Sequence, residues 1–154
     1  MKIYIVSGRK TRGNFIMKNL KGSCDDVTFF DDENECMKSI HLNPDILILD
    51  DNIKSVYPID FLSWIRLNST VHVLYLSKNM KFNYLLKVFR CGSVDYILKD
   101  AYSSFIIRKR VERFRESIDQ MEGVVKIKEF PENNYLKSAF LLRLKVFNFL
   151  VASH

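Results

Sequence analysis

Short apolar segments alternate with amphipathic segments along residues 2–121. Five of the apolar segments have the length of strands, and they lie at 2–6, 27–30, 46–49, 71–76 and 94–98. The segments between them repeat apolar residues at helical spacing, which predicts helices at 11–21, 33–41, 59–67, around 85–89 and along 107–121. The last two helices are predicted to stop at Gly92 and Gly123, because glycine easily adopts the left-handed backbone that ends a helix.

This order of elements predicts an α/β fold. The strand segments are apolar on both faces, which is typical of a parallel sheet that helices cover on each side. Right-handed crossovers then give a flavodoxin-like (βα)5 domain, with a doubly wound parallel five-stranded sheet. Function in such folds lies at the carboxyl ends of the strands. Here those ends carry Ser7-Gly8-Arg9, Asp31, Asp50-Asp51, Ser77-Lys78 and Lys99-Asp100.

Composition excludes several classes of function. The formal net charge is +6, but the basic residues are spread out and not interleaved with aromatics, so direct nucleic-acid binding is not expected. Cys24, Cys36 and Cys91 show no metal-ligand spacing, which favours reduced thiols in a cytoplasmic protein. The most apolar stretch, 135–152, is interrupted by charges, so no membrane span is expected.

Three segments resemble the receiver domains of bacterial response regulators. They are PDILILDDN at 44–52, VLYLSK at 73–78 and GSVDYILKD at 92–100. The resemblance spans residues 2–121 and implies a regulatory module of two-component signalling rather than an enzyme. An alternative, a P-loop at GRKTRG (8–13), is disfavoured because Asn14-Phe15 replace the residues that contact phosphate and metal.

The resemblance assigns a role to four residues. Asp50 would accept a phosphoryl group, a reaction that needs positive charge nearby. Lys99 would bind one phosphoryl oxygen and Ser77 another. Tyr96 would then swing into the space that Ser77 leaves, so that a local charge alters the protein surface.

The sequence departs from the receiver pattern where magnesium would bind. Receivers end the first strand with two acidic residues, and this chain has Ser7-Gly8 there. Asp50 and Asp51 remain as candidate Mg²⁺ ligands, but neighbouring side chains on a strand start on opposite faces. Mg²⁺ binding is therefore expected to be weakened.

Other charged groups near the missing acidic pair leave alternatives open. Asp31 or Asp32 is a candidate additional carboxylate. Arg9 could pair with Asp50 and substitute for the charge of the metal, or it could point to solvent. Two hypotheses follow: a switch site that no longer uses phosphate, and a conventional phosphoacceptor that a histidine kinase phosphorylates on Asp50.

The C-terminal segment predicts a change of structure. We expect a receiver domain at 1–122, a linker at 123–134 that contains Pro131, and a hydrophobic helix at 135–154. Residues 136–154 resemble the first helix of the AAA+ domain of sigma-54-dependent transcriptional activators, although no Walker motif is present. This resemblance implies an attached output domain that controls transcription.

The predicted contact surface is the fourth helix, the fifth strand and the final helix. Basic and acidic residues mix there, which favours a homodimer held by charge pairs. They are Lys87, Arg90, Arg108, Lys109, Arg110, Arg113, Asp95, Glu112 and Glu116. A protein-binding adaptor without any switch is the remaining alternative.

Overall fold

The computed structural model describes residues 1–22, 26–92 and 94–127. The chain divides into a first unit, Met1–Glu112, and a second unit that begins at Arg113. The sheet and the candidate site belong to the first unit.

The first unit is built on a parallel five-stranded sheet with strand order β2-β1-β3-β4-β5. This order confirms the flavodoxin-like fold that the sequence predicts. The strands are β1 (Lys2–Val6), β2 (Asp26–Phe30), β3 (Ile46–Asp50), β4 (His72–Ser77) and β5 (Val94–Leu98). The helices are α1 (Lys10–Leu20), α2 (Glu33–Ser39), α3 (Pro58–Asn68), α4 (Phe82–Arg90) and α5 (Ser103–Ile127), and a short 3-10 helix η1 (Ile40–Leu42) follows α2.

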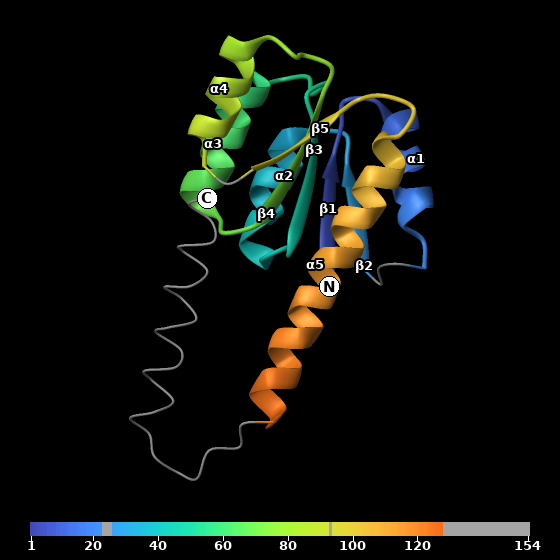
Figure 1. The fold of residues 1–154 in the computed structure, drawn as a ribbon. Coiled ribbons are helices and arrows are strands. Elements are labelled where there is room, and N and C mark those ends of the chain that lie inside the picture. Colours follow the sequence, from blue (N-terminus) through green and yellow to red (C-terminus); the bar gives the residue numbers. More distant parts are fainter. Residues whose placement is uncertain (23–25, 93, 128–154) are drawn as a thin grey trace. The chain divides into compact units, whose positions relative to one another are not determined.

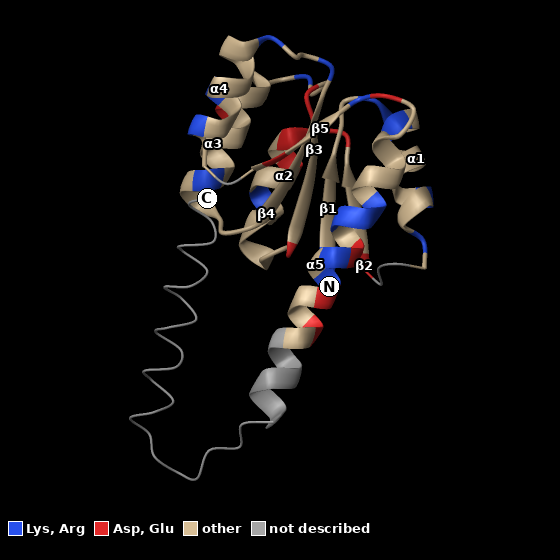
Figure 2. Ribbon diagram, viewed as in Figure 1, with Lys and Arg blue, Asp and Glu red and all other residues tan. Residues whose placement is uncertain are grey.

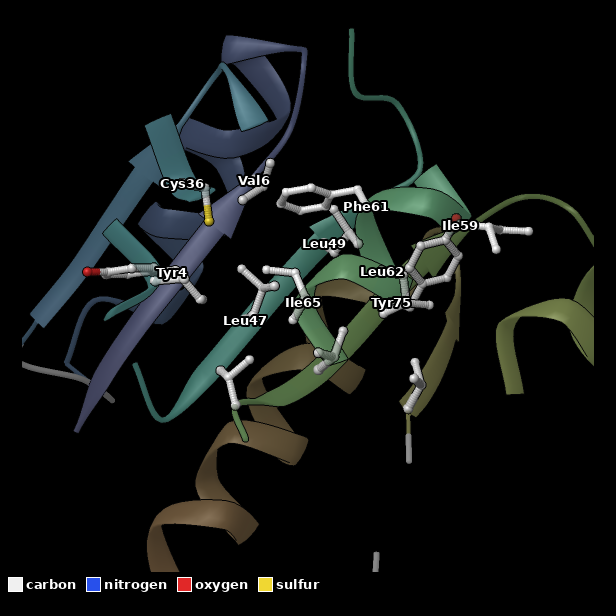
Figure 3. Close-up of a cluster of buried hydrophobic side chains, with 14 of the residues drawn as sticks. Tyr4, Val6, Cys36, Leu47, Leu49, Ile59, Phe61, Leu62, Ile65 and Tyr75 are labelled. Carbon is white, nitrogen blue, oxygen red and sulfur yellow. The ribbon is translucent and has the colours of Figure 1, made fainter. Parts of the chain in front are cut away.

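Helices cover both faces of the sheet. In Figure 1, α2, α3 and α4 lie on one side of the strands and α1 on the other. The side chains between the sheet and α2–α4 form one apolar cluster, in which Phe61 and Leu62 of α3 pack toward Leu49 and Tyr75 of the strands (Figure 3). All five residues of β3 are buried, which explains why this central strand is apolar on both faces.

One glycine sets how closely α1 approaches the sheet. A Cβ atom added to Gly13 would lie 2.1 Å from a ring carbon of Phe29 in β2. Gly13 is buried in the middle of α1, where glycine lowers helix propensity. Close packing against the Phe29 ring therefore explains this residue.

The ends of the last two helices differ in how well the sequence predicted them. Gly92 follows α4 with φ of 106°, which confirms the predicted stop. The predicted end at Gly123 is wrong, because α5 continues to Ile127. Glycine permits a left-handed stop but does not impose one, and it is tolerated inside a helix at a cost of about 1 kcal/mol.

The remaining predictions for the C-terminal segment lie outside the described residues. These are the linker from residue 128 to 134 and the hydrophobic helix at 135–154. Within the part of the chain that is described, no helix combines the length and the apolar character needed to cross a membrane.

Candidate functional site

The carboxyl ends of four strands bring polar residues to one edge of the sheet. Asp50 is the last residue of β3 and Ser77 the last of β4, while Ser7 and Lys99 directly follow β1 and β5. Parallel register aligns these ends, because the backbone N–H of Lys99 donates to the carbonyl of Ser77 at 2.9 Å. Asp50 is only 2% exposed, and Ser7 and Ser77 are fully buried. The sheet therefore gathers the predicted residues Asp50, Ser77 and Lys99 at one edge.

Hydrogen bonds and an ion pair occupy both oxygens of the Asp50 carboxylate. The backbone N–H of Asn52 donates to Oδ1 at 2.9 Å, and the Ser7 hydroxyl donates to Oδ2 at 3.2 Å. The Lys99 ammonium contacts Oδ1 as well. A buried carboxylate needs such partners, since an isolated buried charge is very costly.

Asp51 shares the same ammonium group. Lys99 Nζ contacts Asp51 Oδ1 as well as Asp50. The expectation that the two carboxylates point to opposite faces was wrong, because β3 ends at Asp50 and the alternation of a strand does not extend to Asp51. One lysine ammonium group thus contacts two neighbouring carboxylates and offsets only part of their negative charge.

Arg9 does not pair with Asp50. Its side chain is exposed, so the alternative in which Arg9 points to solvent describes this structure. The charge beside Asp50 comes instead from Lys99, whose side chain is only 12% exposed. Arg9 lies before α1, on a different element from the lysine that reaches the site.

Asp31 and Asp32 are engaged in contacts away from Asp50. Lys10 forms an ion pair with Asp31 at 3.1 Å and lowers the pKa of that carboxyl. Asp32 is the N-cap of α2, where its side chain accepts from the backbone N–H of Asn34 at 2.9 Å. The alternative in which one of them adds a carboxylate beside Asp50 does not describe this structure.

The β3–α3 loop packs against Gly8, the position at the end of β1 where receivers carry their second acidic residue. The N–H of Gly8 donates to the carbonyl of Asn52 at 2.7 Å. A Cβ atom at Gly8 would lie 2.6 Å from that carbonyl oxygen and 3.0 Å from Cγ of Lys54. An acidic side chain at this position thus requires the β3–α3 loop to move.

The carboxylate of Glu33 holds this loop in place. Glu33 is fully buried at the start of α2, and its carboxylate accepts the backbone N–H groups of Ser55 and of Val56, the latter at 2.8 Å. Burial raises the pKa of Glu33, but these backbone hydrogen bonds together outweigh it and leave the pKa below its usual value. The sequence did not single out Glu33, since it lies in an acidic run with no sign of its distant partners.

Tyr96 lies against the β4–α4 segment. Its hydroxyl donates to the carbonyl of Asn79, whose own N–H donates to the Ser77 hydroxyl at 3.0 Å. The Tyr96 ring packs against Tyr75 and against Phe89 of α4, with centroid distances of 6.0 and 6.4 Å. Ser77 and Tyr96 thus meet through Asn79.

A second tyrosine, Tyr75, links the sheet to α4 and was not predicted. Its hydroxyl lies 2.6 Å from the hydroxyl of Tyr84 on α4. Burial and this contact raise the pKa of Tyr75, so both groups stay neutral near pH 7. The strand pattern gives Tyr75 the appearance of an ordinary core residue.

The two candidate magnesium ligands of the site are both paired with a lysine. Two carboxylates are present, Asp50 and Asp51, and both contact Lys99. In the described ranges, no group of three or more His, Cys, Asp or Glu residues is placed to hold a metal ion. The arrangement holds the Lys99 ammonium group between the carboxylates of Asp50 and Asp51. This ion pair lies next to the hydrogen bonds that join Ser77, Asn79 and Tyr96.

Comparisons with solved structures identify the fold. The receiver domain of a response regulator from Francisella is 23% identical with a TM-score of 0.68, and the match covers 76% of this chain and 98% of that domain. A two-component response regulator from Clostridium difficile is 18% identical with a TM-score of 0.69, over 77% of this chain and 98% of that one. No protein-family model and no curated protein matches the sequence. Residues of the first unit therefore adopt the fold of response-regulator receiver domains.

Proposed function

We propose that this chain is a regulatory receiver module of two-component-type signalling whose switch site is held by an internal ion pair instead of magnesium and phosphate. The contact of one partly buried lysine, Lys99, with both Asp50 and Asp51 carries this proposal. The module acts by changing its protein contacts and is not an enzyme. We place it in the cytoplasm, where two-component partners and reduced cysteines are expected.

Phosphorylation of Asp50 is disfavoured by the surroundings of its carboxylate. A nucleophilic oxygen must be accessible, and Asp50 is 2% exposed with both oxygens in hydrogen bonds. Attack on a phosphoryl group also needs a cation that offsets the developing charge. Among the described residues, the ammonium group that contacts Asp50 is that of Lys99, and it is shared with Asp51.

The proposed output surface is the face formed by α4, β5 and α5. Phe82, Leu86 and Phe89 make an apolar stripe on α4 and are 72%, 36% and 51% exposed. We propose that this stripe supports a homodimer, since exposed apolar patches mark contact surfaces. In this proposal charge pairs are secondary to the apolar stripe, because Asp95 and Glu112 already pair with basic residues of the same chain.

A transcriptional output domain is part of the same proposal. The resemblance of residues 136–154 to the start of a sigma-54 activator AAA+ domain supports it, although this segment lies outside the described residues. The gene provides the test: codons for a Walker A loop downstream of His154 are expected. A stop codon directly after His154 would exclude this output domain and leave the receiver proposal standing.

The phosphorylation question is tested by intact mass spectrometry. The full chain is incubated with acetyl phosphate and magnesium, beside a phosphorylation-competent receiver as a positive control. We expect no phosphoryl adduct on this chain under conditions that modify the control. An adduct that disappears in Asp50→Asn would overturn the proposal.

The second candidate function is the conventional phosphoacceptor, served by a histidine kinase. It is supported by the placement of Asp50, Ser77 and Lys99 at one sheet edge. The same experiment decides between the two, because only the conventional receiver gives an Asp50-dependent adduct. A protein-binding adaptor differs from both in that Lys99→Met would leave partner binding unchanged.

A further inference from the structure

A basic groove lies between α3 and α4, away from the strand-end site. It has a volume of about 430 Å³ and opens to solvent. Its lining includes Ile59, Arg66 and Leu67 of α3 and Lys87, Arg90 and Cys91 of α4 and its C-cap. We refer to it as the α3–α4 groove.

The charge of this groove has one sign. Its lining contains three cationic side chains and, among the described residues, no acidic one. Lys87 and Arg90 are three residues apart on α4, so they lie on the same side of that helix, and α4 contains no acidic residue (Figure 2). Two of the basic residues therefore form a continuous cationic edge.

Apolar groups form much of the rest of the groove. Leu67 is 85% exposed, and Ile59 at the base is 8% exposed. Cys91 is partly buried, with its thiol 3.2 Å from the Ser63 hydroxyl. An exposed leucine beside a hollow lined by apolar groups is a feature of contact surfaces.

We propose that the α3–α4 groove binds an acidic amphipathic segment of a partner protein. An apolar side chain of that segment fills the hollow against Leu67 and Ile59, and its carboxylates pair with Lys87 and Arg90. Charge complementarity selects acidic partners, and the apolar hollow selects a peptide over a bare phosphate or a nucleic-acid backbone, which would leave Leu67 uncovered. The groove shares Lys87 and Arg90 with the predicted α4–β5–α5 surface, but it does not include the apolar stripe of Phe82, Leu86 and Phe89. The proposal does not depend on the phosphorylation state of Asp50.

The first test measures binding of a peptide to the full chain. The probe is a fluorescein-labelled synthetic helix of about four turns with leucines on one face flanked by glutamates. Fluorescence anisotropy is expected to show saturable binding that weakens as the salt concentration rises, because salt screens the exposed ion pairs between the peptide glutamates and Lys87 and Arg90. A peptide with lysine in place of each glutamate is expected not to bind. Equal binding of both peptides would overturn the proposal.

Charge-reversal variants locate the site. Lys87→Glu/Arg90→Glu is expected to weaken binding at least about tenfold, a difference of about 1.4 kcal/mol. Lys18→Glu/Lys38→Glu is the matched control, since it changes net charge equally and also alters exposed basic residues in last helical turns. Equal losses in both variants would show that the net charge of the chain, not the groove, attracts the peptide.

Two further measurements keep the result independent of folding defects. Leu67→Ser keeps all charges and changes a side chain that is 85% exposed, so it is expected to fold and to lose binding. Alkylation of Cys91 by N-ethylmaleimide, mapped by peptide mass, is expected to slow when the acidic peptide is bound. Full binding by Leu67→Ser, or an unchanged Cys91 rate at saturation, would refute the assignment to this groove. Competition by a single-stranded oligonucleotide would also refute it, if the oligonucleotide loses its binding in Lys87→Glu/Arg90→Glu to the same extent as the peptide.

Discussion

Replacing Lys99 with methionine removes the ammonium group that contacts both Asp50 and Asp51. The side chains of Lys99, Asp50 and Asp51 are 12%, 3% and 21% exposed, so solvent screens the remaining charges poorly. Loss of one partner from a buried ion pair costs about 3–5 kcal/mol. Asp50 keeps its hydrogen bonds from Ser7 and Asn52 in the variant. We therefore expect the free energy of unfolding to fall by about 3 kcal/mol, the lower end of this range.

The assay is equilibrium urea unfolding at pH 7, followed by fluorescence of the single tryptophan, Trp64. For a chain of this length, about 3 kcal/mol corresponds to a fall of about 6–12 °C in the midpoint of thermal unfolding.

A double-mutant cycle supplies the control. Asp50→Asn in the Lys99→Met background is expected to restore at least about 1 kcal/mol, since it removes a buried charge that has lost its partner. The same substitution in the wild-type chain is not expected to stabilise. A Lys99→Met variant within about 0.5 kcal/mol of wild type would refute the buried ion pair as described.

Three further predictions concern other parts of the first unit. Gly13→Ala is expected to destabilise by about 1–3 kcal/mol in urea unfolding, because the added methyl overlaps the Phe29 ring; a stabilised variant would contradict this packing. The pKa of Glu33 is lowered in the folded state, so its contribution is present above the unfolded pKa of about 4.3 and is lost as pH falls through the folded value. Glu33→Gln should therefore cost about 1–2 kcal/mol at pH 7 and flatten the acid side of the stability profile, whereas an unchanged profile would rule out the loop contacts. Burial raises the pKa of Cys36 to about 12, so a thiol reagent at pH 8 is expected to modify Cys91 and leave Cys36 intact in the folded protein; equal rates would contradict it.

Local pattern was enough to predict the elements of the sheet. Apolar segments of strand length alternate with helical periodicity, and right-handed crossovers leave few ways to arrange them. The same rule places the carboxyl ends of parallel strands together, so Asp50, Ser77 and Lys99 could be assigned to one edge from sequence positions alone. The end of α5 could not be predicted from the sequence, since Gly123 permits both a helix stop and a continuing helix.

Tertiary structure decided which charges meet at the site. The sequence places both Arg9 and Lys99 just after the carboxyl ends of strands, but only the packed chain shows that Lys99 reaches Asp50 and Asp51 while Arg9 faces solvent. The role of Glu33 depends on backbone N–H groups that lie 22 and 23 residues along the chain. Partners so distant in sequence leave no local pattern.

The site at the carboxyl ends of the strands shows the same division. The sequence determined that Ser7 and Gly8, and not carboxylates, follow the first strand, because residue identity alone decides whether a carboxylate exists. Only the tertiary structure shows that the Asn52 carbonyl lies against Gly8 and that Ser7 donates to Asp50. These contacts join residues more than forty positions apart, and the parallel pairing of β1 with β3 is what brings them together.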